Sequence, residues 1–298
     1  MLNITHYHRP TTVREAVALL VPGRAVIAGG TDLMVNPRYT QGVTELVDIS
    51  RLDLAYIRLA DGWKANRQAY MGAATTMYEV QNSPLLASIA SGILAKAAAT
   101  CGSPNIRNVA TIGGNVCSAL PSGDTLTTLL VLEAKVTLES LQGQREVVLT
   151  DFFLGPARTV LKQELVVEIS FQVPDPLSGA AFYKLGRTEE DISIVNVAAL
   201  LTLDEQGQIA KARIAAGAVA PTPLRAFQAE DFLLGKVPDQ ANLAEAARLT
   251  MEAVSPITDQ RATADYRRKV TRVCALRALE QALTNCAAAN PNHRRNLV

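Results

Sequence analysis

The sequence predicts an α+β protein in which two α+β units precede a smaller α+β domain. Up to residue 172, short helical and strand-like patterns alternate, and residues 173–181 (VPDPLSGAA) then combine two prolines with a glycine and a serine. Beyond them, strand-like patterns come first and long helical patterns last. Stretches rich in Pro and Gly indicate boundaries, and strands followed by helices are typical of a separate α+β domain. We therefore expect one region at 1–177, a second at 178–288 and a tail at 289–298.

The first unit, over about residues 1–55, is predicted from one helix signal and two strand signals. Thr12 and Glu15 have the spacing of a capping box, and apolar residues follow at helical intervals. RAVIAGG (24–30) predicts a short buried strand that ends at a Gly-Gly pair, and TELVDIS (44–50) predicts a second strand. Together they predict a small β/α unit.

The second unit, over about residues 56–177, begins around AYMGAATT and has another capping box at Thr76 and Glu79. Two helices are predicted, at SPLLASIASGILAKAAA (83–99) and at SGDTLTTLLVLEA (122–134), the latter capped by Asp124. Strands are predicted at KVTLES (135–140), REVVLT (145–150) and ELVVEISFQV (164–173).

The last region is predicted to hold three strands and two helices. The strand patterns are AFYKLGR (181–187), SIVNVAALLTL (193–203) and IAKARIAAGAV (209–219), and the helix patterns are residues 242–254 and 264–283. DEQGQ (204–208), between the second and third strand patterns, is typical of a hairpin turn.

Composition excludes several classes of function. The net charge of +1 and the pI of about 7.7 give no electrostatic reason to expect nucleic acid or an anionic membrane as a partner. No apolar stretch is long enough for a membrane span, and the N-terminus lacks the pattern of a signal peptide, so we expect a cytoplasmic protein. The four cysteines and three histidines are not clustered at metal-binding spacings, so no metal site is expected.

Two stretches share one design: VIAGGTDL (26–33) and NVATIGGN (108–115) are each an apolar run that stops at Gly-Gly before a small polar residue. Glycine permits positive φ and close approach of a ligand, and successive exposed N–H groups form an anion-binding nest. Taken singly, such a pair is more often only a tight turn. The single-loop nucleotide motifs G-x-G-x-x-G and G-x-x-x-x-G-K-[ST] are absent. As a pair, the two stretches predict a nucleotide diphosphate site shared between two loops.

Ordered blocks along nearly the whole chain resemble the FAD-binding (medium) subunits of the xanthine dehydrogenase, or molybdenum hydroxylase, family, to which the carbon monoxide dehydrogenase flavoproteins belong. The blocks are AGGTDL (28–33), RNVATIGGN (107–115), PSGDT (121–125), DFFLGPARTVLKQELVVEI (151–169), FYKLGRTEEDISIVNVA (182–198), AGAVAPTPLRA (216–226) and DYRRKV (265–270). The resemblance implies an FAD domain of the vanillyl-alcohol-oxidase (PCMH) type with two subdomains, about 1–55 and 56–177. It implies a carbon monoxide dehydrogenase flavoprotein C-terminal domain at 178–288.

The same resemblance implies the cofactor-binding residues. The FAD pyrophosphate would lie between the two Gly-Gly loops. Asp124 would hydrogen-bond the sugar or adenine end, Lys184 would reach towards the isoalloxazine, and Val166 would pack near the ring. Cys101 stands where animal relatives place an aromatic residue against the flavin. The full set is Val26, Ile27, Ala28, Gly29, Gly30, Thr31, Asp32, Leu33, Cys101, Thr111, Ile112, Gly113, Gly114, Asn115, Asp124, Val166 and Lys184.

The function that the resemblance implies is electron transfer within a larger oxidoreductase. A large partner subunit would hold the molybdenum cofactor, a small one two [2Fe–2S] clusters, and FAD on this chain would pass electrons to NAD⁺ or another acceptor, in a heterotrimer or its dimer. No catalytic residue is expected of this chain. In relatives that use nicotinamide, the segment with Arg187, Glu190 and Asp191 lies near the flavin edge; a solvated loop is the other interpretation. A self-contained flavoenzyme and a cofactor-free assembly module are the alternative functions.

Overall fold

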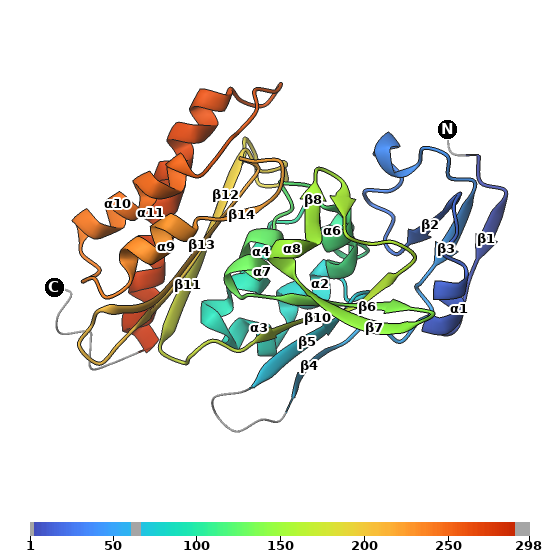
Figure 1. The fold of residues 1–298 in the computed structure, drawn as a ribbon, viewed down its shortest axis with the longest axis horizontal. Helices are drawn as coiled ribbons and strands as arrows, with labels where there is room; N and C mark the ends of the chain where they lie inside the picture. Colours follow the sequence, from blue (N-terminus) through green and yellow to red (C-terminus); the bar gives the residue numbers. More distant parts are fainter. Residues whose placement is uncertain (1–2, 61–66, 290–298) are drawn as a thin grey trace.

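The computed structural model describes residues 3–60 and 67–289, and it arranges three units in a row along the long axis of the molecule (Figure 1). An N-terminal three-stranded unit lies at one end, a five-stranded sheet with its helices lies in the middle, and a four-stranded sheet with the C-terminal helices lies at the other end. Of the tail predicted at 289–298, only Ala289 belongs to the described residues, and it ends the last helix. No helix of the described ranges is long and apolar enough to cross a membrane.

The N-terminal unit is a parallel sheet of order β1-β3-β2 with one short helix. Its elements are β1 (His6–His8), α1 (Val13–Ala18), β2 (Arg24–Ile27), the 3₁₀ turn η1 (Pro37–Tyr39) and β3 (Glu45–Asp48). The capping box is confirmed, because the Glu15 amide donates to Thr12 Oγ1 and the Thr12 amide donates to the Glu15 carboxylate. The strand predicted at 24–30 is shorter, and it is half-buried rather than buried because it lies at the sheet edge and lines a cavity.

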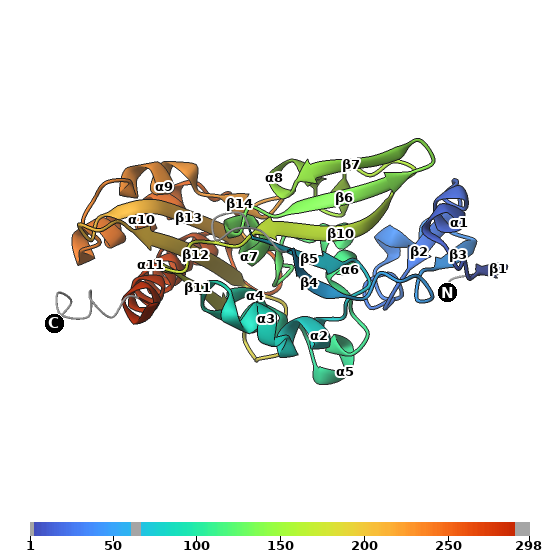
Figure 2. The same cartoon turned by 90° about the horizontal axis from the view of Figure 1, so that it is seen from below.

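The middle unit is an antiparallel sheet of order β4-β5-β10-β6-β7. Its strands are β4 (Ile57–Ala60), β5 (Gln68–Gly72), β6 (Lys135–Ser140), β7 (Gly143–Val148) and β10 (Leu165–Gln172). Its helices are α2 (Met77–Asn82), α3 (Pro84–Ser88), α4 (Ile93–Ala99), α5 (Pro104–Arg107), α6 (Ile112–Ser118), α7 (Leu126–Val131) and α8 (Leu149–Phe152). A small hairpin of β8 (Phe153–Gly155) and β9 (Arg158–Thr159) follows α8. Helices α2 to α5 lie together on one side of the sheet (Figure 2).

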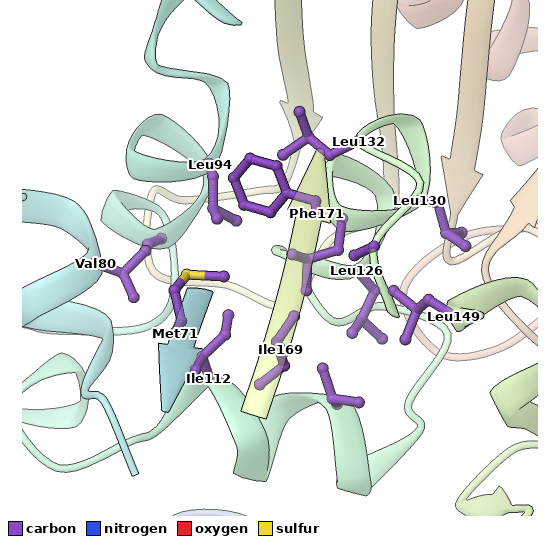
Figure 3. Packing of buried hydrophobic residues seen from close by; sticks show 14 of the residues in the cluster. Met71, Val80, Leu94, Ile112, Leu126, Leu130, Leu132, Leu149, Ile169 and Phe171 are labelled. Carbon is purple, nitrogen blue, oxygen red and sulfur yellow. The ribbon is translucent and has the colours of Figure 1, made fainter. Parts of the chain in front are cut away.

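The main hydrophobic core lies between this sheet and its helices. Met71 of β5 and Ile169 and Phe171 of β10 are fully buried against helix residues such as Leu94 and Ile112 (Figure 3). Burial of each such side chain contributes roughly 1.5–3 kcal/mol. The core anchors the start of α6, which adjoins the candidate site.

The prediction of one helix over 83–99 is wrong, because the chain breaks between α3 and α4. Ala90, Ser91 and Gly92 all have left-handed φ angles, of 46°, 60° and 71°. The Ser91 hydroxyl accepts a hydrogen bond of 3.4 Å from the amide of Ala180, in the first strand of the last unit. The turn therefore packs against a strand about ninety residues away, which apolar spacing in the helix does not reveal.

The last unit is an antiparallel sheet of order β11-β12-β13-β14. Its elements are β11 (Ser178–Leu185), β12 (Val195–Leu203), β13 (Ile209–Gly217), β14 (Leu224–Arg225), α9 (Phe227–Leu233), α10 (Gln240–Glu252) and α11 (Ala264–Ala289). The hairpin at 204–208 is confirmed: Asp204 accepts from the amides of Gln206 and Gln208. Along β12, Val195, Val197, Ala199 and Leu201 face the three helices, whereas Ala198 and Leu200 join the main core. This alternation places the four-stranded sheet directly against the middle unit.

Candidate functional site

A cavity of about 470 Å³ opens between the N-terminal and middle units, within the size range of ligand pockets. It is lined by β2 and the loop after it, the start of α6, residues 120–124, residues 161–166 and residues 190–192. All three units therefore contribute to its wall.

Almost all the sequence-predicted residues line this cavity. They are Val26, Ile27, Ala28, Gly29, Gly30, Thr31, Asp32, Leu33, Cys101, Thr111, Gly113, Gly114, Asn115, Asp124 and Val166. The two exceptions are Ile112 and Lys184. Ile112 is fully buried in the main core (Figure 3), and the Lys184 ammonium is engaged by other groups of the protein.

The first Gly-Gly pair lies directly against the residues that precede the second. A Cβ added to Gly29 would lie 1.9 Å from the carbonyl oxygen of Val109, a distance that no side chain tolerates. Gly30 has a φ of +71°, in the left-handed region that favours glycine. The close approach of two backbones explains Gly29, and the turn conformation explains Gly30.

The loop after β2 exposes a run of free backbone donors. Within the described ranges, the amides of residues 28–33 donate no hydrogen bond to any protein group. These six consecutive N–H groups belong to residues that line the cavity. Such a run is an anion-binding arrangement.

The second Gly-Gly pair differs from the prediction of a second loop of free amides. It forms the first turn of α6, with Thr111 as the N-cap. The amides of Ile112, Gly113 and Gly114 donate to the Thr75 carbonyl, the Ala73 carbonyl and Thr111 Oγ1 respectively. Pairing with residues 73 and 75 and the helix cap at Thr111 therefore occupy donors that the sequence pattern alone presents as free.

Gly113 and Gly114 of α6 lack a side chain for different structural reasons. A Cβ on Gly113 would lie 2.5 Å from the Ala73 carbonyl oxygen, so this glycine lets the start of α6 pack directly against the backbone of Ala73. A Cβ on Gly114 would meet only Thr111 Oγ1, at 3.0 Å, and Gly114 lines the cavity. Gly114 therefore leaves room for a ligand.

Asp124 is not the helix cap that the sequence predicts. Helix α7 has Thr125 at its N-cap, without a side-chain cap bond. The Asp124 carboxylate instead accepts from Lys184 Nζ at 2.9 Å and from Ser193 Oγ at 2.6 Å, and Lys184 also donates to the Thr100 carbonyl at 2.8 Å. Both members of the ion pair are buried, and burial raises the pKa of Asp124. Partners from the last unit thus determine where this carboxylate points.

No Lys, Arg or His stands among the described residues that line the cavity, whereas five carboxylates do. They are Asp32, Asp124, Glu164, Glu190 and Asp191. A diphosphate in this cavity would meet main-chain N–H groups rather than cationic side chains. The free amides of residues 28–33 fit that requirement, and so does the space beside Gly114.

Cys101 and Cys117 line the cavity as well. Burial raises the pKa of the Cys101 thiol to about 11 and that of Cys117 to about 12. Because the thiolate is the reactive form, we expect both to be alkylated slowly by iodoacetamide at pH 7.5, about tenfold faster per pH unit up to pH 10. Mass spectrometry of the alkylated peptides measures this. A rate that levels off below pH 9 would contradict the expectation.

Sequence reasoning missed Tyr39, Ser118 and Leu161 as lining residues. Ser118 stands four residues after Gly114, so a helix starting at Ile112 would have placed both on one face. Tyr39, in the 3₁₀ turn η1, and Leu161, between β9 and β10, carry no comparable signal.

Comparison with known proteins covers nearly the whole chain. Residues 2–176 match the FAD-binding domain in molybdopterin dehydrogenases, and residues 180–282 match the carbon monoxide dehydrogenase flavoprotein C-terminal domain. The chain is 36% identical to the nicotinate dehydrogenase FAD-subunit of Eubacterium barkeri, over 84% of each chain. It is 30% identical to the putative xanthine dehydrogenase FAD-binding subunit of Escherichia coli K12, over 95% of this chain and 97% of the relative.

Solved structures agree with these relatives. A chain of carbon monoxide dehydrogenase from Hydrogenophaga pseudoflava superposes with a TM-score of 0.89 at 32% identity, covering 96% of this chain and 100% of that one. A chain of quinoline 2-oxidoreductase from Pseudomonas putida 86 gives 0.86 at 27% identity, covering 96% and 99%. The similarity therefore extends through all three units.

Proposed function

Since this chain belongs to the FAD-binding medium subunits of the molybdenum hydroxylase family, we propose that it carries electrons from iron–sulfur clusters of a partner to a terminal acceptor. When bound, FAD would supply this chemistry by taking up electrons singly and releasing them in pairs. The observation that carries the proposal is the run of free amides at 28–33, on residues that line a cavity without cationic side chains among its described lining.

The residues of this chain would bind and orient the cofactor. The amides of the loop after β2 would hold the diphosphate, the space beside Gly114 would admit it, and Gly29 would keep the two segments in contact. Asp124 lines the cavity, and Val166 contributes an apolar wall. The reach of Lys184 towards the isoalloxazine and the place of Cys101 beside the ring stay predictions.

We further propose that the partners are a large subunit with the molybdenum cofactor and a small subunit with two [2Fe–2S] clusters, in a heterotrimer or its dimer, and that NAD⁺ is one acceptor. The chain resembles the FAD subunits named for nicotinate and xanthine dehydrogenases at 36 and 30% identity, and a carbon monoxide dehydrogenase medium chain at 32%. Such even similarity supports a substrate choice made in the large subunit. The domain division at 177/178 and the cytoplasmic location also stay predictions.

The proposal is tested by measuring whether the protein binds FAD. Protein purified with its partners, or alone after incubation with FAD, should be yellow and should release FAD on heating, as measured by absorbance and chromatography of the supernatant. A supernatant without FAD would contradict the proposal and favour the cofactor-free module. Co-purification of two further subunits separates the electron-transfer subunit from a self-contained flavoenzyme.

A graded series at Gly114 ties this test to the cavity. We expect FAD content to fall from Gly114→Ala to Gly114→Val, because each larger side chain takes more of the space that Gly114 leaves. The apoprotein should keep its fold, because the crowding of Thr111 Oγ1 is offset by up to about 1 kcal/mol of helix propensity in Gly→Ala. Urea unfolding of the apoproteins is the control. Full FAD content in Gly114→Val would count against a cofactor at this position.

A further inference from the structure

The amides of residues 28–33 donate no hydrogen bond within the described protein, so the loop is held through its carbonyls, its backbone contacts and its side chains. The amides of Met34 and Asn36 donate to the Gly30 and Asp32 carbonyls. At its start, the contact between Gly29 and Val109 supplies one anchor. At its other end, Asp32 Oδ2 accepts a hydrogen bond of 2.5 Å from Ser118 Oγ, at the end of α6. The carboxylate thereby ties the loop to the helix that begins with the second Gly-Gly pair.

A second bond reaches the same serine from beyond the loop. Tyr39 Oη donates to the backbone carbonyl of Ser118 at 2.5 Å. Ser118 is only 8% exposed, and burial raises the pKa of Tyr39 to about 12, so this phenol stays a donor at physiological pH. Asp32, before η1, and Tyr39, the last residue of η1, are thus both hydrogen-bonded to one residue of α6.

The negative charge of Asp32 is unfavourable for diphosphate binding unless the carboxylate has a partner in the protein. Asp32 is a carboxylate within the loop whose amides suit an anion, and none of the described residues forms an ion pair with it. A like charge free to approach a diphosphate would weaken its binding. The Ser118 hydroxyl gives the carboxylate a fixed partner and holds it there.

We propose that Asp32, Ser118 and Tyr39 form a latch that positions the diphosphate-binding loop, with Asp32 acting through Ser118 rather than on the ligand. The proposal rests on FAD as the ligand of the cavity. These are positioning residues: they hold the free amides of residues 28–33 open towards the cavity.

The experiment measures FAD affinity of the full-length apoprotein by flavin fluorescence in Asp32→Ala, Asp32→Asn, Ser118→Ala and the double variant Asp32→Ala/Ser118→Ala. Each alanine variant should raise the Kd about tenfold, as expected for loss of a hydrogen bond to a charged group. The double variant should equal Ser118→Ala, because that variant already lacks the Asp32–Ser118 bond together with the bond of 2.9 Å from Ser118 Oγ to the Gly114 carbonyl. Asp32→Asn should bind FAD at least as tightly as the wild type, because its carbonyl still accepts from Ser118 and its negative charge is gone.

Tyr39→Phe should raise the Kd less, because it loses a bond between uncharged groups. Asp53→Asn, an exposed carboxylate of the same unit, is the matched control and should change nothing. Equal weakening in Asp32→Asn and Asp32→Ala would place the carboxylate on the ligand and overturn the latch. Additive effects of Asp32→Ala and Ser118→Ala, or none, would overturn it as well.

A second measurement needs no FAD. Arg38 lies between the two fastened residues and is exposed, so trypsin cleavage after Arg38 in the apoprotein reports on the latch. Cleavage should be several-fold faster in the double variant and unchanged in Asp53→Asn. If the wild type binds no FAD but the double variant is cleaved faster, the latch stands and the proposed function fails. If FAD binds and cleavage is unchanged, the latch fails.

Discussion

Replacing Gly29 with alanine is expected to abolish FAD retention and to destabilise the protein. The added Cβ would lie 1.9 Å from the Val109 carbonyl oxygen and 2.5 Å from its carbon. Both obstacles are backbone atoms, which cannot rotate away as a side chain does, so the loop after β2 must separate from the residues before α6. Overpacking of this kind costs about 1–3 kcal/mol or more. FAD content and the urea midpoint of the apoprotein measure the two effects.

The neighbouring glycine offers a matched control. At Gly30 the three atoms nearest to an added Cβ belong to the side chains of Ile27 and Met34, the closest at 3.2 Å. Gly30→Ala should therefore cost only the left-handed backbone strain, about 1–2 kcal/mol, and retain much of the FAD. Wild-type FAD content and stability in Gly29→Ala would refute the contact between the two segments.

Replacing Lys184 with methionine is expected to cost about 3–5 kcal/mol of stability at neutral pH, because it leaves the Asp124 carboxylate buried without its cation. Burial already raises the pKa of Asp124 in the folded wild type, and loss of Lys184 raises it further. The folded variant then binds more protons than the unfolded chain above the unfolded pKa of about 3.9, so its stability falls as pH rises. The deficit relative to wild type should be larger at pH 8 than at pH 5, in urea unfolding.

Two variants make this result specific. Lys184→Met with Asp124→Asn removes the charge as well as its partner and should recover part of the loss. Lys135→Met breaks an ion pair with Glu146 in which both side chains are largely exposed, at 44% for Lys135 and 52% for Glu146. It should lower the free energy of unfolding by less than about 1 kcal/mol. A pH-independent deficit in Lys184→Met would show that Asp124 is not an unpaired charge in the variant.

Local signals in the sequence were reliable where the interacting groups are close along the chain. The capping boxes at Thr12 and Thr76 and the turn at 204–208 form as predicted, because each depends on groups within about four residues. The two Gly-Gly motifs identified the segments that meet at the cavity, because only glycine permits the contact with Val109 and the space beside residue 114. The ordered motifs likewise identified the family, which the relatives then confirmed.

The tertiary structure alone decided the rest. The predicted helix at 83–99 breaks at residues 90–92, where Ser91 meets Ala180, and Asp124 leaves its predicted cap for Lys184 and Ser193. The amides of Ile112, Gly113 and Gly114 in α6 are occupied by Thr75, Ala73 and Thr111, so of the two Gly-Gly pairs only the first keeps free amides. Sequence by itself determined that the two Gly-Gly segments would adjoin one cavity. Which of these residues are free to bind a ligand depended largely on partners 37 to 89 residues away, whose burial gives their hydrogen bonds an advantage over local ones.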